Sequence, residues 1–291
     1  MKTLRDAYAG GRFGLSFELF PPKSPAGEAA LFHHVGRLVE FEPSFITCTY
    51  GAGGSTQQKT LEIVAKVRKD FDLPVATHLT CVGLTADQLR DYLRQAIEAG
   101  VLSVVALRGD PPKGETAFTK TAGGFGYANE LVAMIRGEFA EMGIAVAGYP
   151  EKHLEAPDLA TDLANLKRKI DAGADAVITQ LFYHNEDFFR FRDACDAAGI
   201  TTPIVPGLLP VTNFAQIQRI TALCGAKLPQ PFIDKLSAAG DDDDAQFRAG
   251  VEFATEQTQQ LIESGVAGIH YYVLNKSEAA SEVLRAVTLP A

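Results

Sequence analysis

Apolar and β-branched residues occur in short runs along the whole chain, and stretches with helical spacing separate the runs. Runs of this length, bounded by Gly, Pro, Asn or Asp, are typical of buried parallel strands. Eight runs predict strands, at 14–19, 44–49, 74–79, 102–107, 144–149, 175–180, 203–206 and 267–273. Helices are predicted between them, and several end in Gly, which helix C-termini favour. Their ranges include 57–69, 85–99, 127–141, 158–172, 185–198 and 213–224.

Eight strands alternating with helices in a chain of 291 residues predict an α/β fold. The expected architecture is a single-domain (β/α)8 TIM barrel over residues 1–291. A doubly wound sheet is the alternative, but its GxGxxG dinucleotide motif is absent after the first strand, where Phe20-Pro21-Pro22-Lys23 follows. We expect an extra helix near 228–238. We interpret the acidic run 241–244 as a solvated loop and helix start rather than a metal site.

Composition narrows the class of partner. The chain carries 27 Lys and Arg against 36 Asp and Glu, a net charge of -9, which argues against binding to nucleic acid or an anionic membrane. No apolar run approaches the roughly 20 residues of a membrane span. Cys48, Cys81, Cys195 and Cys224 are far apart and form no CxxC pair, so neither a zinc site nor a redox motif is indicated. We expect a cytoplasmic protein that holds no metal.

Polar residues lie where the predicted strands end. The run 101–107 stops at Arg108-Gly109-Asp110, followed by two prolines. Because the carboxyl ends of barrel strands form one mouth, we expect a site there. Alternation along this strand places Ala106 and Arg108 inward, and Val105 and Leu107 towards the helices. The residues expected at the mouth are Glu18, Thr49, His78, Arg108, Tyr149 and Gln180, with Asp110 beside them.

Glu18 is the candidate proton donor. It lies between Phe17 and Leu19, so we expect burial and a raised pKa, which suits a general acid. A surface carboxylate on a sheet edge is the alternative. Arg108 and Asp110 could equally pair with each other.

One face of the predicted helix 158–172 carries Asp162, Asn165, Arg168 and Lys169 at spacings of three and four. Such a row is usually a solvated face. The alternative is a phosphate site, in which Arg and Lys hold an anion and Asp and Asn hold a ribose or an adenine amide.

Seven segments, in order between about residues 12 and 285, resemble the bacterial type of the methylenetetrahydrofolate reductase family. They are Ser16-Phe17-Glu18-Leu19-Phe20-Pro21-Pro22-Lys23, Thr49-Tyr50-Gly51-Ala52-Gly53-Gly54, Thr77-His78-Leu79-Thr80, Leu107-Arg108-Gly109-Asp110, Tyr149-Pro150-Glu151-Lys152-His153, Asn165-Leu166-Lys167-Arg168-Lys169 and Pro206-Gly207-Leu208-Leu209-Pro210-Val211.

The resemblance implies a barrel that binds FAD without a Rossmann motif. NADH or NADPH would reduce the flavin and leave. The flavin would then pass a hydride to 5,10-methylenetetrahydrofolate, giving 5-methyltetrahydrofolate for one-carbon metabolism and methionine synthesis. It also implies association into a homo-oligomer.

The same resemblance assigns roles to residues. Glu18 would be the general acid, and Asp110 would contact both the pterin and the flavin and tune the redox step. The positions matching FAD contacts are Thr49, Tyr50, Ala52, His78, Arg108, Gly109, Asp110, Ala128, Tyr149, His153, Asp162, Asn165, Arg168 and Lys169. The positions matching folate contacts are Glu18, Thr49, Asp110, Gln180, Gln216 and Lys276.

Two positions depart from the family pattern. Lys276 stands where better-known bacterial members carry Arg, and Ile220 stands where some carry an aromatic residue. Eukaryotic members continue into a regulatory domain that binds S-adenosylmethionine, which we expect to be absent here. A flavin-free pterin-binding one-carbon transferase and a non-catalytic flavin protein are the alternatives.

Overall fold

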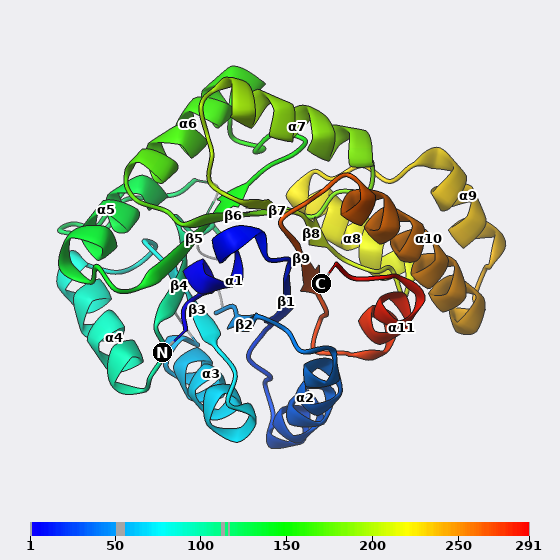
Figure 1. The fold of residues 1–291 in the computed structure, drawn as a ribbon, viewed down its shortest axis with the longest axis horizontal. Coiled ribbons are helices and arrows are strands. Elements are labelled where there is room, and N and C mark those ends of the chain that lie inside the picture. Colours follow the sequence, from blue (N-terminus) through cyan, green and yellow to red (C-terminus); the bar gives the residue numbers. More distant parts are fainter. Residues whose placement is uncertain (1, 51–55, 112–113, 116, 291) are drawn as a thin grey trace.

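Parallel strands surround the centre of the molecule and helices surround the strands (Figure 1). The computed structural model describes residues 2–50, 56–111, 114–115 and 117–290. The sheet runs in the order β7-β6-β5-β4-β3-β2-β1-β9-β8. Its strands are β1 Gly14–Leu19, β2 Phe45–Cys48, β3 Val75–Thr80, β4 Ser103–Leu107, β5 Gly143–Gly148, β6 Ala176–Thr179, β7 Ile204–Val205, β8 Gly207–Leu208 and β9 Gly268–Tyr272.

The predicted seventh strand is divided in two. Pro206 has no N–H to donate, so the hydrogen-bond ladder breaks there. β7 before it pairs with β6, and β8 after it pairs with β9. Gly207 N donates to the Thr179 hydroxyl at 2.9 Å, and the Pro206 carbonyl accepts from His270 N at 3.0 Å. The two halves thus join the ends of the sheet, which confirms the barrel and corrects the number of strands.

The helices that surround the barrel include those predicted. Their bounds are α2 Pro25–Leu38, α3 Gln57–Phe71, α4 Ala86–Glu98, α5 Ala128–Glu138, α6 Leu159–Asp171, α7 Asn185–Ala197, α8 Phe214–Cys224, α9 Gln230–Ala238, α10 Asp243–Glu263 and α11 Glu278–Ala286. The expected extra helix is α9. Asp242 caps α10 by accepting from Ala245 N at 2.9 Å, as the helix-start interpretation expects. None of the described helices combines the length and apolarity that a bilayer crossing requires.

The short helix α1 (Leu4–Ala7) lies in the middle of the barrel in the view of Figure 1. Leu4 is fully buried, and its N–H donates to Ser103 Oγ at the start of β4 at 2.9 Å. Leu4 and Tyr8 pack with Phe45 and Val105 in a core cluster inside the barrel. Because this cluster fills the amino end of the barrel, space for a ligand is left at the carboxyl end.

The inward and outward faces of β4 are opposite to the prediction. Val105 belongs to the inner cluster, beside its register partner His78, whereas Ala106 belongs to the core beneath the helices. The run is apolar on both faces, so alternation carries no information about which face is inside. Arg108 still reaches the mouth because β4 ends at Leu107 and Gly109 takes a left-handed conformation with φ of 89°.

Candidate functional site

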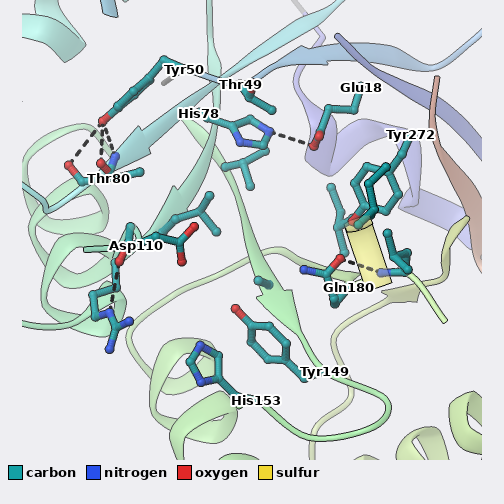
Figure 2. A pocket seen from close by; sticks show the side chains of 18 of the residues that line it. Glu18, Thr49, Tyr50, His78, Thr80, Asp110, Tyr149, His153, Gln180 and Tyr272 are labelled. Carbon is teal, nitrogen blue, oxygen red and sulfur yellow. Dashed lines mark hydrogen bonds and ion pairs between the residues drawn. The ribbon is translucent and has the colours of Figure 1, made fainter. Parts of the chain in front are cut away.

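A cavity of about 490 Å³ opens at the carboxyl end of the barrel (Figure 2). All seven residues predicted at the mouth line it, from the ends of β1 to β6, and three of the residues that the resemblance assigned to FAD join them. The seven are Glu18, Thr49, His78, Arg108, Asp110, Tyr149 and Gln180, and the three are Tyr50, Gly109 and His153. The structure therefore brings together side chains that are spread over more than half of the sequence.

Glu18 faces two histidines. Its Oε2 lies 3.3 Å from His78 Nε2 and 3.7 Å from His270 Nε2 (Figure 2 shows the first contact). The fully buried His270 is held on its other side by Ser16 Oγ, 2.8 Å from Nδ1. Burial raises the pKa of Glu18, but the charges of the two nearby histidines outweigh it and lower the pKa to about 2.

The prediction of a raised pKa for Glu18 is therefore wrong. The expectation rested on the apolar neighbours within β1, and the burial that they predict is found. The histidines come from β3 and β9, which pack beside Glu18 only in the closed barrel. His270 was not predicted, although the pairing of Ser16 with His270 in the β1–β9 register explains its position.

Tyr50 fixes the ends of two strands. Its hydroxyl lies 3.0 Å from Thr80 Oγ1 and also accepts from Thr80 N. Burial raises the pKa of Tyr50 to about 12, so the phenol stays neutral. Thr49 follows β2 and donates its N–H to the Leu19 carbonyl at 2.9 Å. Both residues line the cavity with backbone positions set by these contacts.

Arg108 pairs across the mouth with Glu155, and not with Asp110. Its Nη1 and Nη2 lie 2.6 and 2.7 Å from the two Glu155 oxygens, and its Nε donates to the Gly109 carbonyl at 3.2 Å. The guanidinium carbon lies 5.0 Å from the centre of the Phe118 ring. Asp110 remains exposed at the mouth. Glu155 was not predicted.

The segment after β5 frames another side of the mouth. The rings of Tyr149 and His153 pack edge to face, with their centroids 4.6 Å apart. The His153 backbone N–H donates to Asp162 Oδ2 at 2.8 Å. Asp162 lies in the first turn of α6, so this helix anchors the segment.

The predicted polar face of α6 is divided between two environments. Asn165 and Arg168 are exposed and bonded to each other, with Arg168 Nη1 2.8 Å from Asn165 Oδ1. Lys169 turns towards the barrel instead, where its ammonium donates to the Ala147 carbonyl and lies 5.9 Å from the Tyr149 ring centre. Burial lowers the pKa of Lys169 to about 8, although the negative charge of Asp162 acts to raise it. None of these four residues lines the cavity itself.

Other predicted residues lie outside the cavity wall. Gln216 is exposed on α8, one turn before Ile220, which lines the cavity. Lys276 is exposed two residues after Leu274, which also lines it. Ala128 begins α5 away from the cavity, and Ala52 falls outside the described residues.

The apolar part of the wall was largely missed. Its side chains come from inward positions of the strands, from residues just after them and, for Ile220, from α8. They are Val82, Val105, Leu107, Ala147, Ile178, Leu181, Leu209, Ile220 and Leu274, and the polar residues Thr80 and Tyr272 join them. Tyr272 lies two positions after the inward His270, so alternation within β9 could have found it. Its hydroxyl donates to the Thr179 carbonyl at 2.7 Å.

Comparisons with known proteins identify the family of this chain. The family model described as methylenetetrahydrofolate reductase matches residues 3–288. A relative from Escherichia coli named 5,10-methylenetetrahydrofolate reductase is 37% identical over 92% of this chain and 88% of its own length. An Arabidopsis thaliana relative named methylenetetrahydrofolate reductase (NADH) 1 is 40% identical over 94% of this chain.

The chain spans about half the length of the plant relatives that it matches, 48% for the Arabidopsis protein. A solved structure from Clostridium thermocellum, described as binding two copies of 5-methyl-5,6,7,8-tetrahydrofolic acid, matches with a TM-score of 0.62. That match covers 97% of both chains at 14% identity, which supports the barrel fold. The extent of the family match and the identity to the bacterial relative show that this chain belongs to the methylenetetrahydrofolate reductase family.

Proposed function

We propose that this protein uses FAD and NADH or NADPH to reduce 5,10-methylenetetrahydrofolate to 5-methyltetrahydrofolate. The observation that carries the proposal is that Glu18 and Asp110 line one cavity at the open end of the barrel. One carboxylate stands in the wall among imidazoles and the other is exposed at the mouth. Family membership and the names of the bacterial and plant relatives support the same reaction and favour NADH as reductant.

The residues present fit a flavin dinucleotide. The cavity has an apolar wall for a planar ring system and polar groups around its mouth. At Gly109 a Cβ atom would lie 2.9 Å from both Thr80 Cβ and Val82 Cγ1, so only glycine allows the backbone to pack this closely. When bound, FAD supplies the hydride transfer between the nicotinamide and the folate. We assign its contacts to Thr49, Tyr50, Ala52, His78, Arg108, Gly109, Asp110, Ala128, Tyr149 and His153.

We propose that the α6 residues hold the polar half of the dinucleotide. Arg168 and Lys169 supply positive charge for the diphosphate, and Asp162 and Asn165 supply hydrogen bonds for ribose and adenine. Support comes from Lys169, whose ammonium lies beside Tyr149 and so close to the cavity wall. The outward position of Arg168 suits a ligand that extends from the mouth across the surface of α6.

We assign the proton donor to Glu18. With a pKa of about 2 its carboxylate is ionised near neutral pH, so it must take up a proton before it can give one to the folate nitrogen. A folate bound against Glu18 would remove the remaining water from a side chain that is already only 20% exposed. The burial that raises the pKa of Glu18 would then increase, and the two histidines could pass a proton to it.

Asp110 would stabilise the cationic form of the folate and oppose negative charge on the reduced cofactor. Gln180 lines the cavity and, with Thr49, would contact the pterin. Gln216 and Lys276 are exposed and lie within four residues of Ile220 and Leu274, which line the cavity, and we assign them to the remainder of the folate. Lys276 would meet the glutamate carboxylates with a single ammonium rather than the paired donors of Arg.

The test is the visible absorption spectrum of the purified protein before NADH, after anaerobic NADH, and after addition of 5,10-methylenetetrahydrofolate. Flavin bands that bleach with NADH and return with the folate are expected. A colourless protein that FAD cannot reconstitute would refute the proposal in favour of a flavin-free pterin-binding barrel. Bands that bleach but do not return would support FAD as the cofactor and refute 5,10-methylenetetrahydrofolate as the substrate. Cytoplasmic location and association into a homo-oligomer stay predictions.

A further inference from the structure

The ion pair between Arg108 and Glu155 lies across the mouth of the cavity. Arg108 follows β4 and lines the cavity, while Glu155 belongs to the segment between β5 and α6. Both Glu155 oxygens are engaged, at 2.6 and 2.7 Å from the two terminal guanidinium nitrogens. The Glu155 side chain is 54% exposed and that of Arg108 20%, so the pair stands at the boundary between cavity and solvent.

Glu155 occupies a guanidinium edge that offers two parallel N–H groups. An Arg side chain recognises a phosphate or carboxylate most strongly through two parallel N–H groups. Glu155 holds the edge formed by Nη1 and Nη2, and the Nε donor is directed to the Gly109 carbonyl. The Phe118 ring lies against the guanidinium as well. No edge with two free donors is left for an incoming anion.

The position of Glu155 is set by its own segment. Its backbone N–H donates to His153 Nδ1 at 3.1 Å, and His153 N in turn donates to Asp162 on α6. Among the described residues, the Glu155 side chain itself forms hydrogen bonds only with Arg108. Breaking the ion pair therefore frees the Glu155 carboxylate to enter solvent without disturbing the segment that carries it.

We propose that Glu155 is an internal competitor for the anion that Arg108 binds, and that it thereby sets the affinity for the dinucleotide. This proposal rests on the proposed function, in which Arg108 contacts FAD, and it adds that Arg108 binds the FAD diphosphate together with Arg168 and Lys169. The diphosphate gains Arg108 only as Glu155 releases it. The carboxylate keeps Arg108 at the mouth while the site is empty, at the expense of weaker cofactor binding.

If Glu155 were a positioning residue, the affinity for FAD would change in the opposite direction. If Glu155 instead orients Arg108 for the cofactor and stays bound to it, removal of its charge weakens FAD binding. The sign of the change in FAD affinity therefore separates competition from positioning.

The experiment is a titration of the FAD-stripped full-length protein with FAD, followed by quenching of flavin fluorescence. Glu155→Gln keeps the shape of the side chain and removes the charge. We expect the dissociation constant to fall about twofold to fivefold at low ionic strength, as is typical of a partly exposed ion pair. The difference should shrink as salt screens the pair.

A matched control is available on the outside of the barrel. Arg90 of α4 and Glu138 of α5 form another two-oxygen ion pair, with contacts of 2.8 to 3.1 Å. Glu138→Gln should leave FAD binding unchanged. Arg108→Gln should weaken FAD binding, and adding Glu155→Gln to it should then change nothing further, because the competitor has lost its target. Thermal unfolding of each FAD-free variant confirms that it is folded.

Each outcome decides a separate point. Unchanged or weaker FAD binding by Glu155→Gln overturns the competition while the proposed function stands. An equal gain in the Arg108→Gln background also overturns it, because the effect would then not pass through Arg108. A wild-type protein that does not bind FAD at all overturns both this proposal and the proposed cofactor.

Discussion

Replacing Glu18 by Gln removes a carboxylate that two histidines hold in its ionised form. The pKa of Glu18 falls from an ordinary value of 4.5 to about 2 in the folded protein. Each pKa unit corresponds to about 1.4 kcal/mol, so the ionised side chain contributes on the order of 3 kcal/mol to the free energy of unfolding. Because the folded pKa is lowered, this contribution is complete above the unfolded pKa and is lost as pH falls from about 4.5 towards 2.

The assay is urea unfolding of wild type and Glu18→Gln, monitored by circular dichroism at several values between about pH 7 and about pH 3. We expect the wild type to be more stable near neutral pH and the difference to narrow in acid, where protonated Glu resembles Gln. Glu98→Gln, at an exposed position at the end of α4, serves as the control for the loss of a carboxylate as such. A difference that stays constant or widens in acid would refute the reasoning.

The same variant tests the catalytic role of Glu18. If Glu18 supplies the proton for folate reduction, Glu18→Gln should still be reduced by NADH but should fail to pass the hydride to 5,10-methylenetetrahydrofolate. Stopped-flow absorbance resolves the two half-reactions. Survival of both would show that the proton comes from another group.

Three further predictions address cofactor tuning, phosphate binding and packing. Asp110→Asn should raise the flavin reduction potential and slow the oxidation of the reduced enzyme by 5,10-methylenetetrahydrofolate. An unchanged reduction potential, measured by equilibration with a redox dye, would contradict the electrostatic role of Asp110. Because the pKa of Lys169 is about 8, the dissociation constant for FAD should rise as pH increases through that value, and Lys169→Met should remove this dependence. Gly250→Ala should lower the free energy of unfolding by about 2 kcal/mol or more, since its Cβ would lie 1.7 Å from the Val211 carbonyl oxygen. At Gly137 on α5 an added Cβ meets open space, so Gly137→Ala should raise the free energy of unfolding by about 0.5 kcal/mol. Chemical denaturation of the two glycine variants checks the last pair.

Local patterns predicted the fold where one face of an element differs from the other or where a breaker marks its end. The first strand was placed at 14–19, and β1 is Gly14–Leu19. The faces of β4 were reversed because Val104, Val105 and Ala106 are all buried, so the sequence holds no contrast between them. The predicted seventh strand is divided at Pro206 because proline lacks a backbone N–H. The apolar residues around Pro206 led us to predict one continuous strand.

The same distinction separates the site residues that were predicted from those that were missed. Strand-end residues such as Tyr149 and Gln180 were predicted because their place depends only on where a strand stops. The partners Glu155 and His270 were not, since each meets its partner only when distant strands or loops are packed side by side. The pKa of Glu18 depends on such partners, which explains why burial could be predicted and the direction of the shift could not.

The pairing of β1 with β9 joins opposite ends of the chain, from Gly14 with Gly268 to Glu18 with Tyr272. During synthesis β1 leaves the ribosome long before β9, so Glu18 lacks His270 and Tyr272 until the chain has been made as far as β9. A nascent chain that stops before β9 leaves one edge of β1 unpaired, and unpaired edges invite association with other chains. Completion of the site and protection of the barrel from aggregation therefore happen in the same late event, the arrival of the last strand.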